Sequence, residues 1–158
     1  MSGATPIDRD LLDAVTLEAR ASARKRMNRN FHAAASDRCN RLLNAVEPES
    51  YIAPHRHLDP GKDEVFVVLR GRFGVAIFDD KGVVTRTHVL SAGGDCMGVD
   101  IPHGTWHTLV SLEPGSVFLE AKGGPYAPLS QAERAGWAPA EDSPEAGAYL
   151  ARLRGLFG

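Results

Sequence analysis

Residues 54–71 read PHRHLDPGKDEVFVVLRG and combine a turn signal with an apolar strand. His55 and His57 occupy alternate positions of a predicted strand, so both imidazoles would project to one face. The Pro-Gly dipeptide at positions 60–61 suits the two central positions of a type II turn. Counting outward from such a two-residue loop places His57 opposite Glu64, where paired side chains lie about 5 Å apart at Cβ. The spacing predicts two imidazoles and a carboxylate at one point of a hairpin.

A second segment, IPHGTWH at residues 101–107, adds a histidine. Its proline and glycine predict a turn, after which Thr105, His107 and Leu109 share one face of a new strand. Three nitrogens and one carboxylate oxygen suit iron, manganese, nickel, zinc or copper, and the residue types do not choose among these metals. The alternative is an interior whose histidines only form hydrogen bonds. We therefore expect one divalent transition metal ion (Fe, Zn, Ni or Mn), with these ligands: His55, His57, Glu64 and His107.

The pattern around these segments is mainly β. From about Asn40 to Lys122, runs rich in Val, Ile, Phe and Thr alternate with turn signals. Roughly eight strands, about ten residues apart, are typical of an antiparallel sandwich or barrel, and a jelly-roll barrel fits the length. Thr5, as N-cap, begins a predicted N-terminal helix, and residues 143–145 open a short C-terminal helix. We expect one domain with three parts: helix and arm at 1–35, barrel at 36–125, and irregular segment with helix at 126–158.

Composition narrows the classes of partner. The 158 residues carry a formal net charge of −2, which predicts no general attraction to nucleic acid or membranes. The apolar runs are too short to span a bilayer, and the polar first ten residues do not resemble a signal peptide. Two cysteines, Cys39 and Cys96, are far apart and have no metal-type spacing. These features predict a cytoplasmic protein.

The motifs resemble those of a known superfamily. The pattern H-x-H at 55–57, with Glu64 and Gly71, resembles the first cupin motif, and P-x-G-x-x-H at 102–107 resembles the second. More narrowly, the chain resembles the WbuC family of cupin-fold metalloproteins. That resemblance implies a cupin jelly-roll β-barrel, the same four metal ligands, and an association with surface-polysaccharide gene clusters. The matching stretches are residues 41–45, 51–57, 62–64, 101–107 and 124–126.

Three further residues are candidates for catalytic proton transfer. His103 lies in the turn before His107 and could act as an acid or base at the pocket mouth, because histidine titrates near neutral pH. Tyr126 could place a phenol over the pocket or close the barrel end. The family resemblance places His32 near the pocket, whereas the local sequence alone indicates a loop. For His103 the alternative is an ordinary solvent-facing turn residue.

Two surface features concern partners. The basic cluster at residues 24–29 could attract an anionic small-molecule substrate, although such runs are usually solvated helix ends. In residues 64–70 both faces of the predicted strand are apolar, so its outer face must be covered. The N-terminal helix, the second sheet or another subunit could cover it, and we predict a homodimer because an uncovered apolar face promotes association.

Three functions fit these residues. The first is a metal-dependent enzyme, such as an isomerase or epimerase, that acts on a small polar molecule such as a sugar or sugar nucleotide. The second is a non-catalytic, metal-dependent module that binds or senses a small molecule. The third is an iron-dependent dioxygenase. The metal site is common to all three.

Overall fold

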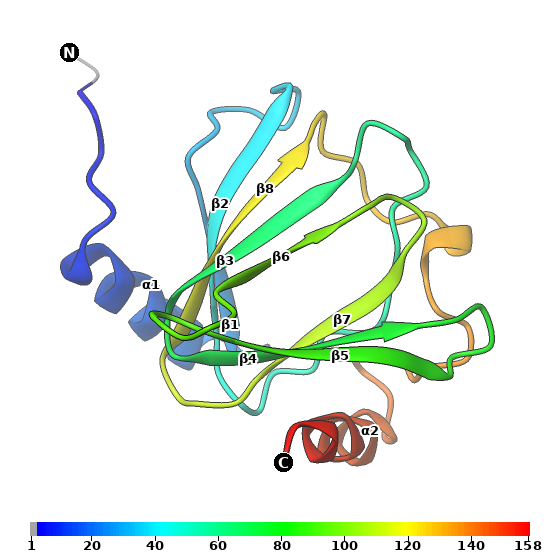
Figure 1. The fold of residues 1–158 in the computed structure, drawn as a ribbon. Coiled ribbons are helices and arrows are strands. Elements are labelled where there is room, and N and C mark those ends of the chain that lie inside the picture. Colours follow the sequence, from blue (N-terminus) through cyan, green and yellow to red (C-terminus); the bar gives the residue numbers. More distant parts are fainter. Residues whose placement is uncertain (1–2) are drawn as a thin grey trace.

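The computed structural model describes residues 3–158, within which there are eight strands (Figure 1). They form two antiparallel sheets, with strand orders β1-β2-β8-β3-β6 and β5-β4-β7. The predicted mainly β fold with a helix near each end is confirmed. The elements are α1 Arg9–Ala21, β1 Arg26–Asn30, β2 Cys39–Val46, β3 Glu64–Arg70, β4 Arg72–Phe78, β5 Val84–Ser91, β6 Gly98–Ile101, β7 Trp106–Ser111, β8 Ser116–Gly123, η1 Gln131–Glu133, α2 Ala146–Arg154 and η2 Gly155–Phe157.

The two sheets face each other as in a jelly roll, and their ladders do not close into one barrel. Side chains alternate along each strand, so Phe66 and Val68 of β3 point inward while Val65 and Val67 point outward. Leu109 of β7 meets the inward residues from the other sheet. The interior core consists of Val46, Phe66, Val68, Phe73, Val75, Leu90, Ile101, Leu109 and Phe118.

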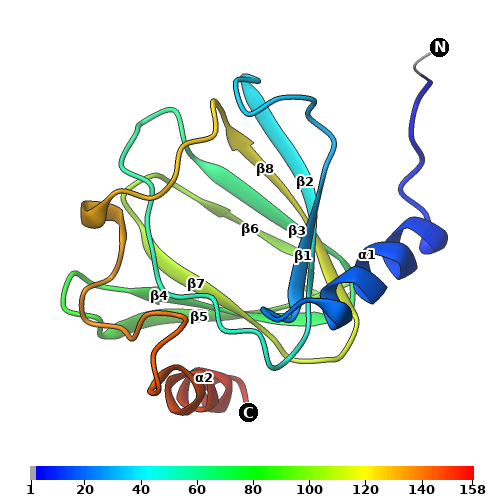
Figure 2. The ribbon, with the colours of Figure 1, turned by 180° about the vertical axis from the view of Figure 1, so that it is seen from behind.

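Helix α1 covers the outer face of the first sheet at β1, β2 and β8 (Figure 2). It begins three residues later than predicted, because Asp8 rather than Thr5 is the N-cap: the Asp8 side chain accepts the Leu11 N–H at 3.0 Å. A carboxylate at this position also interacts favourably with the positive end of the helix dipole. The buried face of α1 consists of Leu12, Val15, Thr16 and Ala19.

Helix α2 covers the outer face of the second sheet. Its buried residues Ala146, Leu150 and Leu153 pack with Phe78 and Trp106. Within residues 3–158, no helix has both the length and the apolar character needed to cross a membrane.

The basic stretch at residues 24–29 lies partly in strand β1, where the sequence predicted a helix end. Arg24 and Arg26 both pair with the carboxylate of Glu141, and Arg29 pairs with Glu18 at 2.7 Å. Two carboxylates therefore balance part of the positive charge of the cluster, and Lys25 Nζ donates to the backbone carbonyl oxygen of Arg20. The arrangement favours a structural role for the cluster over the binding of an anionic substrate.

The outer face of β3 is only partly covered. Leu69 packs near α1, but Val65 and Val67 remain 37% and 39% exposed. The described residues of a single chain therefore do not cover this face, although the sequence predicted that it must be covered.

Candidate metal centre

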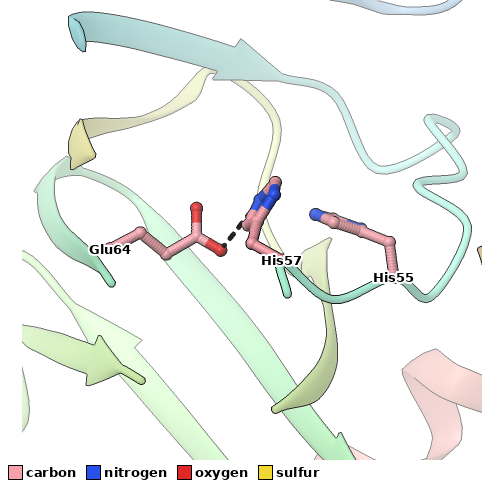
Figure 3. A group of neighbouring side chains, drawn as sticks. All are labelled: His55, His57 and Glu64. Carbon is pink, nitrogen blue, oxygen red and sulfur yellow. Dashed lines mark ion pairs between the residues drawn. The ribbon is translucent and has the colours of Figure 1, made fainter. Parts of the chain in front are cut away.

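The four predicted ligands lie together at one end of the interior, and Figure 3 shows three of them. His55, His57 and Glu64 each offer a donor atom within 4.8 Å of the others. Glu64 Oε1 lies 3.4 Å from His57 Nε2 and 3.0 Å from His107 Nε2. Glu64 and His107 are 3% and 1% exposed. The structure thus brings together side chains that are spread over more than fifty residues of sequence.

The contacts that place the first three residues differ from the predicted hairpin. Residues 55–57 are an extended loop rather than a strand, and they do not pair with Glu64. His55 instead exchanges two backbone hydrogen bonds with His107, each 3.0 Å long. Glu64 begins β3, where it pairs with Ile101 on one side and Lys122 on the other. The histidine loop therefore lies beside β7, and Glu64 reaches it from the other sheet.

The turn between the loop and β3 exists but has a different type. The Lys62 N–H donates to the carbonyl oxygen of Asp59 at 2.9 Å, as predicted for a four-residue turn. A type II turn requires a positive φ at Gly61, and Gly61 does not have one. The Asp59 side chain instead accepts the Gly61 N–H at 2.8 Å, an Asx-type contact that stabilises the turn without left-handed backbone.

The second predicted turn is confirmed. The Thr105 N–H donates to the Pro102 carbonyl oxygen at 3.3 Å, and Gly104 has a φ of 79°. β7 then begins at Trp106, so His107 points into the interior on the same face as the core residue Leu109. Position 104 favours glycine, because a residue with a side chain would be strained at this positive φ.

Hydrogen bonds to the backbone set the tautomers of two histidines. His107 Nδ1 donates to the Thr105 carbonyl oxygen at 2.9 Å, and His55 Nδ1 donates to the Ala53 carbonyl oxygen at 3.1 Å. In the neutral ring, Nε2 then keeps its lone pair, which is the form that binds metal ions. These contacts orient both rings as metal-ligating histidines are usually oriented.

The buried donor atoms fit a bound cation. Glu64 Oε1 and His107 Nε2 are buried, lie 3.0 Å apart and lack a hydrogen-bond partner of acceptable geometry. With a neutral His107 ring both atoms are acceptors, and at this distance they repel each other unless a proton or a metal ion lies between them. Two atoms that bind one ion at about 2.1 Å each, at a right angle, are about 3 Å apart. The imidazole and carboxylate set matches the ligands of divalent transition metals.

The charges of the cluster also favour metal binding. Burial alone would raise the pKa of Glu64, but His107, His57 and Lys122 together lower it below its ordinary value. The pKa of His55 is lowered to about 3, because burial disfavours the imidazolium and His107 adds repulsion. At neutral pH the cluster therefore presents a carboxylate and a neutral His55 ring.

Acid should destabilise the metal-free protein. Unfolded histidine titrates near pH 6.5, whereas His55 in the folded protein titrates at about 3. Between these values the unfolded chain binds more protons, so we expect the free energy of unfolding to fall as the pH is lowered from about 6.5. Urea unfolding of the metal-free protein at several pH values in this range would measure the slope. His55→Gln should make that slope shallower, and an unchanged slope would contradict the assignment.

The C-terminal segment holds the histidine loop from its other side. The Arg56 N–H donates to the Glu133 carbonyl oxygen at 3.0 Å, and the Leu58 N–H donates to Glu133 Oε1 at 2.9 Å. Bonds from the backbone of Leu58 and Ser130 lower the pKa of Glu133 to about 2. Sequence reasoning did not identify Glu133, although Ser130-x-x-Glu133 is a capping-box pattern.

Loss of the Glu133 carboxylate should weaken metal binding. We expect Glu133→Ala to lower metal affinity about tenfold without changing the number of ions bound. Loss of a residue that supports a metal ligand commonly has an effect of this size. Competition with a chromogenic chelator would measure the affinity. The exposed neighbour Asp142→Ala is the control, and equal affinities of the two variants would contradict a positioning role for Glu133.

The three predicted catalytic residues lie outside the cluster's hydrogen bonds and ion pairs. His103 is exposed, and its Nδ1 lies 2.7 Å from Asp63 Oδ1. His32 Nδ1 accepts the Arg41 N–H at 3.1 Å, and Tyr126 is 60% exposed. Each of the three has a position at or near the surface, so a role for any of them in proton transfer stays a prediction.

Sequence reasoning missed a charged pair beside the cluster. Lys122 Nζ lies 3.1 Å from Glu120 Oε1 and 3.6 Å from Glu64 Oε2. Burial would lower the pKa of Lys122, but Glu120 and Glu64 raise it. Burial raises the pKa of Glu120, against the opposing effect of Lys122. The available signal was the alternation of Phe118, Glu120 and Lys122 on one face of a strand.

A family model matches the first part of the chain. The model described as "Domain of unknown function (DUF6016)" matches residues 7–90, which is more than half of the chain. The chain belongs to this family. The DUF6016 match includes three of the four clustered residues and ends before His107. It does not confirm the WbuC resemblance, and none of the curated proteins compared with the chain matches it significantly.

Solved structures show the fold of this DUF6016 protein. A conserved protein of unknown function from Streptococcus pyogenes is 15% identical, with a TM-score of 0.53 over 80% of this chain and 93% of its own. An oxalate oxidase in complex with the substrate analogue glycolate is 15% identical, with a TM-score of 0.51 over 67% and 54%. A cupin superfamily protein from Desulfitobacterium hafniense is 12% identical, with a TM-score of 0.49 over 62% and 76%. The first two structures, whose TM-scores exceed 0.5, show that the DUF6016 protein shares their fold, and its two facing sheets fit a cupin jelly roll.

Proposed function

We propose that this protein binds one divalent transition metal ion through His55, His57, Glu64 and His107 and uses it in an enzymatic reaction on a small polar molecule. The observation that supports the site most directly is the pair of buried acceptor atoms, Glu64 Oε1 and His107 Nε2, that lack hydrogen-bond partners. Burying such atoms without a compensating charge is costly. A cation would satisfy both.

The residues of the chain have separate tasks in this proposal. A bound ion would act as a Lewis acid toward a carbonyl or hydroxyl oxygen. Glu64 supplies the negative charge, and the histidines supply neutral nitrogens. Phe66 and Ile101, both 2% exposed, exclude water from the inner side of the site. His103, Tyr126 and His32 are the proposed proton carriers, and isomerisation, epimerisation and iron-dependent oxygenation are the reactions that this set could perform.

The substrate proposal is supported by the resemblance to the WbuC family. That resemblance favours a sugar or sugar nucleotide in surface-polysaccharide metabolism and a cytoplasmic protein. The enclosed cluster is also suited to a non-catalytic module, because metal ligands and a small interior serve binding as well as turnover. Activity measurements separate these two functions.

The test begins with metal analysis of protein purified without an affinity tag. We expect about one divalent transition metal ion per chain, and its absence after reconstitution with iron, zinc, nickel and manganese would overturn the proposal. The loaded protein is then incubated with sugars and sugar nucleotides, with and without oxygen. Turnover that is lost in His107→Ala supports an enzyme, and activity that needs oxygen and ferrous iron identifies the oxygenase. Ligand binding without turnover identifies the non-catalytic module.

We also propose that two copies associate through the outer face of β3. The support is the exposure of Val65 and Val67 on successive outward positions of β3. Met97, whose carbonyl oxygen accepts the Val68 N–H, is 53% exposed. Light scattering at micromolar concentration should give the mass of a dimer, and Val67→Lys should give a monomer. A monomeric wild-type protein would contradict this proposal.

A further inference from the structure

The wall beside the metal cluster contains a charged pair that the proposed function does not use. Lys122 and Glu120 alternate along β8 on the face that also carries the core residue Phe118. Lys122 Nζ lies 3.3 Å from His57 Nε2 and 3.6 Å from Glu64 Oε2. The Lys122 and Glu120 side chains are only 16% and 12% exposed. A lysine in this position faces the proposed metal ligands from inside the fold.

The ammonium is held in place by a fixed neighbour. Glu120 Oε1 lies 3.1 Å from Lys122 Nζ, and Glu120 Oε2 accepts a hydrogen bond from Asn44 Nδ2 at 2.9 Å. Asn44 is itself buried. Lys122 is therefore part of a connected polar network and not a flexible surface side chain.

Lys122 could have a purely structural role, which is to neutralise the buried carboxylates. The total charge of the metal-loaded site indicates that this is not its only role. Lys122 carries one positive charge and Glu64 one negative charge. Addition of a divalent ion leaves the local charge positive, whether Glu120 is protonated or ionised. A net positive charge in a buried site is costly unless an anion enters it. The metal-loaded site should therefore attract an anionic ligand.

A second buried group indicates what else that ligand carries. Asn40 is 3% exposed, and its Oδ1 has no hydrogen-bond partner. Asn40 of β2 pairs in register with Lys122 of β8, which pairs in register with Glu64 of β3. Residues directly opposite each other in neighbouring strands share a face of the sheet. An unpartnered acceptor thus lies next to Lys122, and it suits a ligand that donates a hydroxyl.

We propose that Lys122 and Asn40 form the ligand-recognition end of the site and that the ligand is a small hydroxycarboxylate. The Lys122 ammonium binds the carboxylate, and Asn40 Oδ1 accepts the hydroxyl. This inference rests on the proposed metal site. On the neighbouring strand β1, Asn28 and Asn30 are exposed and share the inner face with Asn44.

The test compares three probes of similar size: lactate, uncharged lactamide, and propionate, which lacks the hydroxyl. Calorimetry on cobalt-loaded protein measures their affinities, and elemental analysis measures metal content. We expect lactate to bind about 10- to 100-fold more tightly than lactamide, because a hydrogen bond that involves a charged group is stronger than one between neutral groups. In Lys122→Met this preference should fall below about threefold, with metal content unchanged. If the methionine variant fails to fold, Lys122→Gln, which keeps a polar side chain, replaces it in the test. Lys81→Met, on an exposed turn, is the matched control.

The second half of the proposal is tested at Asn40. In Asn40→Leu the preference for lactate over propionate should disappear, while the preference for lactate over lactamide remains. Equal lactate binding by wild type and Lys122→Met, or tighter binding of inorganic phosphate than of lactate, would overturn the inference and leave the metal site standing. A wild-type protein that binds no metal would overturn both.

Discussion

Replacement of His107 by alanine should lower metal affinity by about 100-fold or more. Loss of a supporting residue already costs metal sites about 10- to 100-fold, and His107 is a proposed ligand whose Nε2 lies 3.0 Å from Glu64 Oε1. The substitution removes one of four donors and leaves the Glu64 carboxylate buried with less compensation. Chelator competition and elemental analysis of dialysed protein would measure the loss.

The matched control is His103→Ala, four residues earlier in the same segment. His103 is exposed and bonded to Asp63, so its removal should leave metal content unchanged. Circular dichroism of both variants would show that the strands remain. Retention of a full complement of metal by His107→Ala, with affinity within about threefold of wild type, would show that His107 has only a structural role.

Replacement of Phe73 by alanine should lower the free energy of unfolding by about 3–5 kcal/mol. Phe73 has no exposed surface and lies in the core between the two sheets. Its ring meets that of Phe118 edge to face, with centroids 5.1 Å apart. Truncation removes this contact and leaves a cavity that the strands of two opposed sheets can close only in part.

Urea unfolding of the metal-free protein would measure this change. The control is Val83→Ala, at a position that is 59% exposed, where we expect a change within about 0.5 kcal/mol. A loss of less than about 1 kcal/mol in Phe73→Ala would mean that the interior adjusts far more easily than a packed jelly roll should.

Local patterns predicted the faces of β3 and β7 correctly. Phe66 and Val68 point inward, and so do His107 and Leu109, because a period of two residues is a property of the strand itself. The turn before β7 was also predictable, since proline and glycine restrict or extend the backbone wherever they occur.

Competition between neighbouring groups caused the local errors. Thr5 and Asp8 are both acceptable N-caps, and the helix begins at the aspartate. The Pro-Gly dipeptide favoured a type II turn, but the Asp59 carboxylate stabilises a different one. In both cases the observed conformation has a hydrogen bond from a backbone N–H group to the side chain of a nearby aspartate.

The sequence predicted which side chains gather in the cluster, but not the contacts that place them. His57 and Glu64 do meet, but through the packing of the two sheets and not across a hairpin. Lys122 lies 65 residues from His57 in the sequence, and Glu133 lies 75 residues from Leu58. Strand pairing and loop contacts that no local pattern encodes place both residues beside the cluster.

The sequence by itself determined that this protein is a mainly β jelly roll with histidines and a glutamate suited to one metal ion, because alternation, turn residues and ligand types are read within short segments. Only the tertiary structure decided which strands are neighbours. The order β2-β8-β3 places Asn40, Lys122 and Glu64 in one row, and that row is where the proposed ligand binds. The physical reason is that strand pairing depends on the total burial achieved by the whole chain, a quantity to which every distant segment contributes.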